Sequence, residues 1–264
     1  DVTHPFRQDS DFHFLTGFAE PDAVAVFDAT SDAPFTLFVR PRDPEAEAWN
    51  GLRAGIEGAV ERFGADAAYP LDEFGERLRV QLAGRRSVGY VLGGRLDTDV
   101  LAAIEAVRRY ADRSGVGIPS EVVDIRAILH EQRLLKSPAE IEALLEACRI
   151  SALAHDEALR FAAPGRTERQ VQAVLEYVFR VMDAERVGYS SIVAGGDNAC
   201  ILHYVENDQS LVDGQLLLID AAAEYRHLTS DITRTVPING RFSGPQRAVY
   251  ELVLRAQQEV IAIC

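Results

Sequence analysis

The stretch QLLLIDAAAEYRHLTSDITRTVPI, residues 215–238, decides the fold of the second half of the chain. It contains two apolar, β-rich runs separated by polar residues around Tyr225 and Arg226, which predicts an antiparallel hairpin. With the turn centred there, Asp220 and Asp231 are symmetric about it and lie directly opposite each other. Directly opposite residues have Cβ atoms about 4.5–5.5 Å apart on one sheet face, so the pattern predicts two neighbouring carboxylates.

Two carboxylates this close in an apolar sheet are unfavourable unless another interaction offsets their repulsion and desolvation. At ~5 Å and an effective dielectric constant of ~20 their repulsion costs roughly 3 kcal/mol, and burial adds a desolvation cost. Either one carboxylate keeps its proton, as in an acid–base dyad, or a hard divalent cation lies between the two. The remaining alternative is an off-centre turn that leaves one aspartate facing water. The spacing alone does not choose among the three.

The residues before the hairpin predict two helices followed by strands. Ser137-Pro138-Ala139-Glu140 is a capping box with proline in the first turn, and apolar residues then recur at helical spacing. Pro164-Gly165 ends this helix, and Thr167 with Gln170 caps a second one. The runs SSIVA and ILHYV then predict strands. Helices that lead into an antiparallel sheet are typical of an α+β domain.

The first half of the chain alternates strand and helix signals. AVAVF (Ala23–Phe27) and FTLFV (Phe35–Val39) are short β-rich runs, and Asp43-Pro44 marks a helix start. A second helix is predicted over residues 71–83, SVGYVL is another strand, and Asp97 caps a third helix that ends near residue 113. The alternation predicts an α/β domain over residues 1–121, with a second domain over residues 122–264.

Size and composition exclude several classes of protein. A chain of 264 residues is long for one domain, and 47% hydrophobic with 26% charged residues is typical of a globular protein. The net charge of −14 repels phosphate backbones, which excludes nucleic acid as a partner. The longest aliphatic stretch is far shorter than the ~20 residues of a membrane span. Three cysteines, an odd count, indicate a reducing, cytoplasmic setting.

Several motifs resemble one known family. ILHY (Ile201–Tyr204), LLLIDAAAEY, SDITRT and PINGRFS, in this order, resemble the catalytic domain of aminopeptidase P and its relatives, the pita-bread metallopeptidases. The KSPAEI helix start and the opening FRQDSDFHFLTGFAEPDA fit the same family. The resemblance implies an α/β N-terminal domain and an incomplete α+β pita-bread catalytic domain. The chain halts at Cys264 within a helical pattern, so we expect a fragment.

The same resemblance implies a site with two divalent metal ions, usually Mn²⁺ or Co²⁺, with Zn²⁺ as another possibility. Its first two ligands fall on Asp220 and Asp231, and a histidine and two glutamates belong to segments after Cys264 in such proteins. His203 matches a histidine that contacts substrate or intermediate; the alternative is an ordinary polar strand residue. Thr233 has the position of a residue that supports a ligand carboxylate, although threonine is common in strands.

Two aromatic residues match substrate-binding positions of the family. Tyr189 corresponds to a substrate-pocket residue, with core packing as the alternative. Trp49, the only tryptophan, lies where relatives bring an aromatic side chain toward substrate, while a tryptophan on an amphipathic helix is more often core or interface.

The expected function is the metal-dependent release of an N-terminal residue that precedes proline. The expected partners are peptides with proline in second position, and we also expect a homo-oligomer, either a dimer or a tetramer. The alternatives are a prolidase, which accepts only dipeptides, a creatinase-like hydrolase of a non-peptide substrate, and a non-catalytic pita-bread protein that binds a partner.

Overall fold

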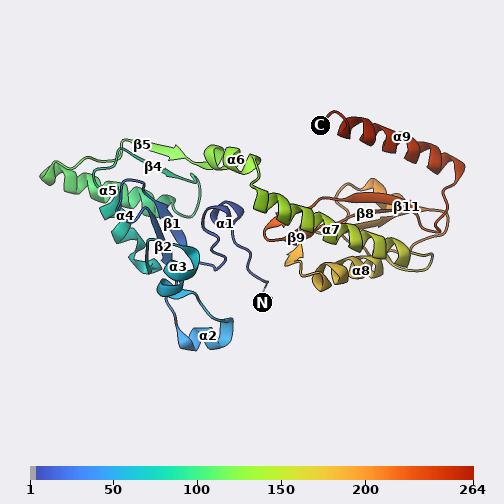
Figure 1. Ribbon diagram of the computed structural model, residues 1–264, viewed down its shortest axis with the longest axis horizontal. Coiled ribbons are helices and arrows are strands. Elements are labelled where there is room, and N and C mark those ends of the chain that lie inside the picture. The colour runs from blue at the N-terminus through green and yellow to red at the C-terminus, as the bar shows by residue number, and fades with distance from the viewer. Residues whose placement is uncertain (1–3) are drawn as a thin grey trace. The chain divides into compact units, whose positions relative to one another are not determined.

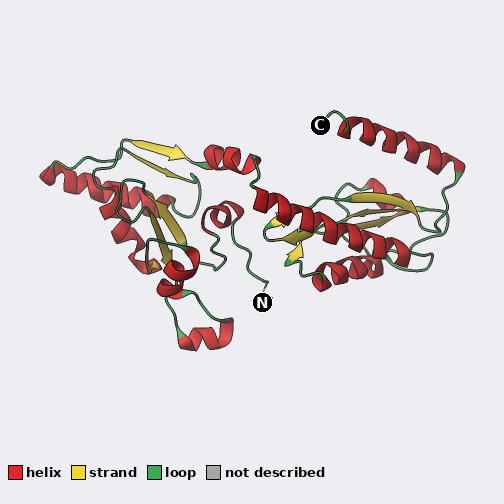
Figure 2. Cartoon of the chain, viewed as in Figure 1, coloured by secondary structure: helices red, strands yellow, loops and turns green. Residues whose placement is uncertain are grey.

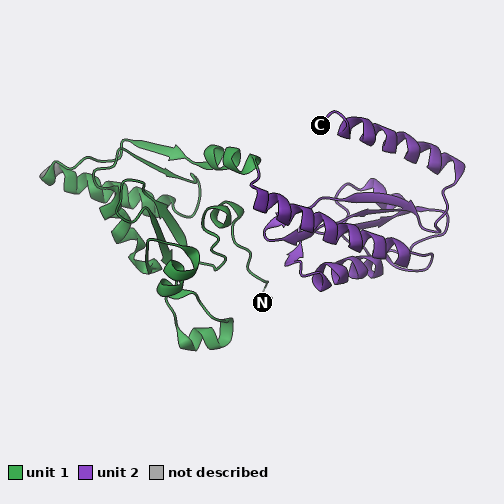
Figure 3. Ribbon diagram, in the orientation of Figure 1, with its two compact units in different colours: residues 1–135 green, residues 136–264 purple. Residues whose placement is uncertain are grey.

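The computed structural model describes residues 4–264, except for the side chains of residues 112 and 113. The chain forms two compact units, Asp1–Leu135 and Lys136–Cys264, coloured separately in Figure 3. Each unit contains both helices and strands (Figure 1). Within the described residues, no helix combines the length and apolar character that crossing a membrane requires.

The first unit is an α/β domain, as predicted. In its three-stranded sheet the order is β1-β2-β3, with β1 antiparallel and β3 parallel to the central β2, and a separate parallel pair joins β4 to β5. The strands are β1 (Val24–Phe27), β2 (Phe35–Val39), β3 (Ala67–Pro70), β4 (Ser87–Tyr90) and β5 (Glu121–Asp124). The helices are α1 (Ser10–Thr16), α2 (Pro44–Asn50), α3 (Gly55–Phe63), η1 (Leu71–Glu73), α4 (Phe74–Leu82), α5 (Asp97–Ser114) and α6 (Arg126–Leu134).

Strand β2 separates two hydrophobic cores because successive side chains point to opposite faces of a sheet. Phe38 packs with residues of α4 and α5, including Phe74 and Leu78. Leu37 and Val39 join the other cluster, which includes residues before β1 and from α3. The predicted cap Asp43 is confirmed, since its carboxylate accepts from the first-turn amides of α2. Helix α5 instead begins at Asp97, with Leu96 at the N-cap position.

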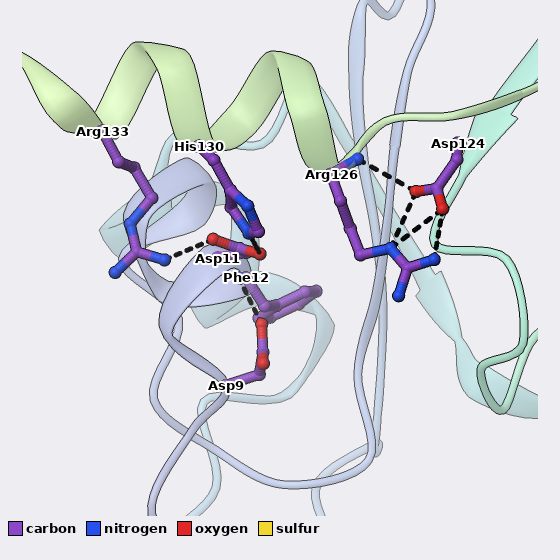
Figure 4. Close-up of polar contacts among 7 residues, drawn as sticks. All are labelled: Asp9, Asp11, Phe12, Asp124, Arg126, His130 and Arg133. Carbon is purple, nitrogen blue, oxygen red and sulfur yellow. Dashed lines mark hydrogen bonds and ion pairs between the residues drawn. The ribbon is translucent and has the colours of Figure 1, made fainter.

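Helix α6 is held to α1 by charged side chains. Figure 4 shows His130 and Arg133 pointing from α6 toward Asp11, which forms ion pairs with both. At the start of α6, Arg126 pairs with Asp124 at the end of β5. Helix α6 therefore lies in the first compact unit, although the predicted boundary assigns it to the second domain. The domain limits themselves, 1–121 and 122–264, stay a prediction.

The second unit combines long helices with antiparallel strands, which agrees with the predicted α+β class (Figure 2). Both predicted capping boxes are present, at Ser137 with Glu140 and at Thr167 with Gln170. The helices are α7 (Pro138–Phe161), α8 (Glu168–Val181), η2 (Gly196–Cys200) and α9 (Gly244–Ile261). The strands are β6 (Arg186–Val187), β7 (Ile192–Gly195), β8 (Leu216–Asp220), β9 (Ala223–Tyr225), β10 (Leu228–Thr229) and β11 (Thr233–Pro237).

Strand β8 is the centre of the sheet β11-β8-β7 and has two different faces. Leu217 and Ile219 are fully buried in the core that α7 and α8 supply, which includes Ile150 and Leu175. Asp220 alternates with these residues and lies on the other face. Helices α7 and α8 therefore pack on the face of the sheet opposite to the one that carries Asp220.

Candidate functional site

The hairpin that carries the two aspartates has a different register from the one expected. Asp220 pairs with Thr233 across β8 and β11, and not with Asp231. The turn consists of Arg226 and His227, both left-handed, with φ of 50° and 62°. It therefore lies one residue later than the sequence indicates, which shifts every cross-strand partner by two. The predicted direct pairing of Asp220 and Asp231 is wrong.

Contacts made by the backbone of the turn explain its position. The main-chain N–H groups of Arg226 and His227 donate to the two carboxylate oxygens of Glu185, at 3.0 and 3.4 Å. Neither residue is a glycine or an asparagine, which normally mark a left-handed turn in sequence. The carboxylate of Glu185, which is distant in sequence, therefore binds this turn, and no residue typical of left-handed turns is present in it.

The two carboxylates nevertheless converge on a third side chain. The hydroxyl of Tyr189 makes a short hydrogen bond to Asp220 and lies 3.1 Å from Oδ1 of Asp231. Asp231 is two positions ahead of Thr233, the partner of Asp220, so the diagonal arrangement keeps both carboxylates on one side. Burial, followed by the hydrogen bond to Asp220, raises the pKa of Tyr189. The phenol therefore keeps its proton as a donor.

This arrangement fits part of a divalent-metal site. Asp220 is half-buried and Asp231 exposed, and their oxygens are the ligand type that hard divalent cations prefer. One phenol proton cannot fully satisfy two carboxylates, so the pair retains acceptor capacity that a cation would use. In the described part of the chain, no group of three or more His, Cys, Asp and Glu side chains is placed to hold a metal. The two aspartates supply a partial ligand set.

Thr233 lies at the start of β11, opposite Asp220, and is exposed. Direct cross-strand partners share a face, so its side chain is on the same side of the sheet as the carboxylate. Support of a ligand carboxylate by Thr233 stays a prediction.

His203 lies in an exposed turn after η2, so the predicted strand ILHYV is wrong. Its neighbour Tyr204 is buried and joins a small cluster with Ile192, Ala194 and Leu218. Ile192 is the partner of Asp220 in β7, so this cluster lies on the aspartate face of the sheet. The segment that carries His203 is thereby held over the face that carries Asp220.

Trp49 belongs to α2 of the first unit, and its side chain is 85% exposed. It is therefore not a residue of that unit's core. Its predicted substrate contact remains a prediction.

Two features of the site escaped sequence reasoning. The hydroxyl of Tyr189 joins the two aspartates, and no spacing rule relates it to either of them; its role in substrate binding stays a prediction. Glu168 is fully buried beneath the segment of His203. An acidic residue in the first turn of a helix is so common that the sequence alone does not single it out.

Comparison with known proteins gives two family matches. The model of metallopeptidase family M24 matches residues 142–264, and the aminopeptidase P N-terminal domain matches residues 1–90. The chain is 43% identical to the Xaa-Pro aminopeptidase of Haemophilus influenzae over 264 residues and 40% identical to that of Escherichia coli over 260. These alignments cover 100% and 97% of this chain, but only 59% of each relative.

Solved structures agree with the sequence matches. Pseudomonas aeruginosa aminopeptidase PepP superposes with a TM-score of 0.93 at 47% identity, covering 98% of this chain and 59% of that one. Zinc-substituted Escherichia coli aminopeptidase P in complex with product gives a TM-score of 0.93 at 39% identity, covering 98% of this chain and 60% of that one. The chain thus spans about 59% of the length of the relatives it matches.

Proposed function

The chain belongs to the aminopeptidase P group of the M24 metallopeptidases, and we propose that the protein releases the N-terminal residue of peptides that have proline in second position. The observation that carries this proposal is the convergence of Asp220 and Asp231 on the hydroxyl of Tyr189. Both carboxylates needed for a metal site are present and on one side of the sheet, on a chain whose relatives are Xaa-Pro aminopeptidases.

Membership of family M24 implies divalent metal ions. We propose two, with Mn²⁺ preferred over Co²⁺ and Zn²⁺, and Asp220 and Asp231 as the ligands that this chain supplies. Bound metal of this kind lowers the pKa of water and polarises a carbonyl oxygen. Tyr189 would orient the two carboxylates, and Thr233 would support Asp220 from the facing strand.

His203 would contact the scissile carbonyl or the oxyanion that forms from it. A histidine suits this work because its ordinary pKa is near neutrality, so that small changes in its surroundings control whether it donates a proton. Trp49, exposed on α2, would bind substrate.

The test uses the full-length protein and Xaa-Pro tripeptides. Removal of metal with a chelator should abolish hydrolysis, and added Mn²⁺ should restore it, while an Ala-Ala peptide should remain a poor substrate. Asp220→Asn should lower Mn²⁺ affinity in calorimetric titration, because one charged ligand is lost. Asp156→Asn is the matched control, since Asp156 is exposed on α7 and pairs with Arg160 at 4.0 Å.

The rival functions give different results in the same assay. Cleavage of Xaa-Pro dipeptides but not of longer peptides would identify a prolidase. Absence of any hydrolysis by the metal-loaded protein would favour a partner-binding protein. Equal turnover of the Ala-Ala and Xaa-Pro peptides would contradict the proposed specificity.

We also propose a homo-oligomer, either a dimer or a tetramer, in the cytoplasm. Trp49 and Leu52, 85% and 81% exposed, supply apolar area of the kind that subunit interfaces bury. Within the described residues all three cysteines are free thiols, which agrees with a reducing compartment. Light scattering of the full-length protein measures the oligomeric state, and a monomer at micromolar concentration would contradict it.

A further inference from the structure

A buried carboxylate organises the segment that carries His203. Glu168, at the first position of α8, is fully buried. Its Oε1 accepts from the Gly195 N–H at 2.7 Å and from Asn198 Nδ2 at 3.0 Å. Its Oε2 accepts from the Tyr204 hydroxyl at 2.7 Å and from the Gln209 N–H at 3.0 Å. A carboxylate has about four acceptor positions, and these four donors fill them.

The four donors lie along one continuous segment. Gly195 is the last residue of β7, and Asn198 belongs to η2. Tyr204 and Gln209 follow η2, and both contact Glu168 at the start of α8. Apart from η2, residues 196–209 form no helix or strand. A segment without regular backbone hydrogen bonds takes its path from side-chain contacts, and Glu168 supplies three of these within 196–209 and a fourth to Gly195 directly before it.

A second buried side chain, that of Asn207, fixes the last part of the same segment. The amide of Asn207 accepts from the Val193 N–H at 3.0 Å and donates to the Ser191 carbonyl at 2.8 Å. These two groups lie on the outer edge of β7, away from β8, so the amide takes the place of a neighbouring strand. His203 therefore lies between two residues that Glu168 binds, Asn198 and Tyr204, and the buried Asn207 holds the chain that follows.

The direct link to His203 is Tyr204, the next residue in the chain. Its ring packs with Ile192, Ala194 and Leu218 on the face of the sheet that carries Asp220. Burial, followed by the hydrogen bond to Glu168, raises the pKa of Tyr204 to about 12, so the hydroxyl remains a donor at neutral pH. The anchored ring holds the backbone at Tyr204, and loss of its hydrogen bond would let this backbone and the adjoining His203 shift.

We propose that Glu168 is a positioning residue for the hydrolysis: through Tyr204 it fixes the segment 196–209 so that His203 stays over the face of the sheet that carries Asp220. This role rests on the proposed function, because it assigns His203 to the reaction. A buried carboxylate is costly to desolvate, and an apolar residue would fill the same space at lower cost. The four hydrogen bonds account for a glutamate at this position.

The test removes one hydrogen bond at a time from the full-length, Mn²⁺-loaded enzyme. Tyr204→Phe keeps the buried ring and deletes only the hydroxyl that binds Glu168. Tyr177→Phe is the matched control, since Tyr177 lies on α8 and is 67% exposed. Glu168→Gln is the stronger variant, because its amide nitrogen cannot accept the two donors that now face one oxygen.

We expect Tyr204→Phe to lower kcat for an Xaa-Pro tripeptide about tenfold, since small misplacements of a reacting group cost up to ~100-fold. The dissociation constant for Mn²⁺ should stay within about twofold, because no metal ligand changes, and Tyr177→Phe should match the wild type. The decisive readout is a double-mutant cycle with His203→Ala. If Tyr204 acts through His203, Tyr204→Phe has no further effect on kcat in the His203→Ala background.

The outcomes separate this role from the proposed function. An active wild type in which Tyr204→Phe lowers kcat by the same factor with and without His203 would show that the effect is general, and would overturn the role alone. An unchanged kcat in both Tyr204→Phe and Glu168→Gln would also overturn the positioning role of Glu168 alone. A metal-loaded wild type that cleaves no Xaa-Pro peptide would overturn the proposed function and the role together.

Discussion

Gly188 directly precedes Tyr189, and its replacement by alanine tests the geometry of the site. The Gly188 N–H donates to the Ala222 carbonyl at 2.8 Å and continues the pairing of β6 with β9. A Cβ at this position would lie 2.0 Å from Cγ2 of Thr229 in β10. Ordinary carbon contacts are about 3.5–4.0 Å, so either the Thr229 side chain or the backbone that carries Tyr189 would have to move by more than about 1 Å.

The size of the effect follows from this contact. Overpacking a closely packed site costs about 1–3 kcal/mol, and we expect Gly188→Ala to destabilise the second unit by this amount. The backbone φ of Gly188 is not positive, so the cost comes from the contact with Thr229. In Thr229→Ser the methyl group is absent, and the next atoms lie 3.2 Å from the added Cβ, which requires a shift of only a few tenths of an ångström.

The assay is differential scanning calorimetry of the full-length protein, with the kcat of the Mn²⁺-loaded enzyme as a second readout. The double variant Gly188→Ala/Thr229→Ser should be more stable than Gly188→Ala alone by about 1 kcal/mol, a positive coupling. Gly244→Ala is the control, because the added Cβ at that position meets open space. Additive effects of the two substitutions would refute the predicted contact, and an unchanged kcat in Gly188→Ala would refute its influence on Tyr189.

Three further predictions concern the turn, a helix cap and acid stability. Arg226→Asn with His227→Gly should raise the free energy of unfolding by about 1 kcal/mol, since Asn-Gly suits two left-handed positions; a lower stability than that of the wild type would mean that the turn lies elsewhere. Ser137→Ala should cost about 1 kcal/mol by calorimetry through loss of the capping box, and a change below ~0.3 kcal/mol would contradict this. The hydrogen bond from Arg42 lowers the pKa of Glu47 to about 2. The ionised Glu47 therefore contributes its full stabilisation of the fold at pH values above the ordinary pKa of a glutamate, and this contribution is lost as the pH falls toward 2. Acid unfolding of Glu47→Gln should therefore show a weaker pH dependence in this range, and an identical profile would exclude the contribution.

The elements that could be predicted are those whose signals are local. The helices at Pro44, Pro138 and Glu168 begin with a capping side chain and were predicted from it. Helices α3 and α6 follow Ala54 and Ile125, which make no side-chain capping bond, and no local signal in the sequence predicts either helix. A helix without a start signal depends on packing, which a single sequence does not display.

The errors at the site have the same cause. The turn at Arg226 has no glycine or asparagine, and a carboxylate from before β6 binds its backbone, so its position depends on a contact distant in sequence. The run ILHYV has strand composition, but the hydrogen bond from Tyr204 to Glu168 and the amide of Asn207 hold it as an irregular segment. In both places a buried polar contact between distant residues overrides the local preference.

The two carboxylates lie on one side of the sheet although the predicted register is wrong, because their placement does not depend on direct cross-strand pairing. Strand β8 places Asp220 between Ile192 on one neighbour and Thr233 on the other, while Asp231 precedes β11 and Tyr189 precedes β7. Three separate segments therefore bring the two carboxylates and the phenol together, and no turn has to set the distance between the carboxylates. A shift of two positions moves Asp231 from the direct to the diagonal position on the same face, whereas a shift of one would move it to the opposite face. The proposed metal site therefore requires only that the two aspartates lie on the same face of the hairpin, and not that its turn has one particular centre.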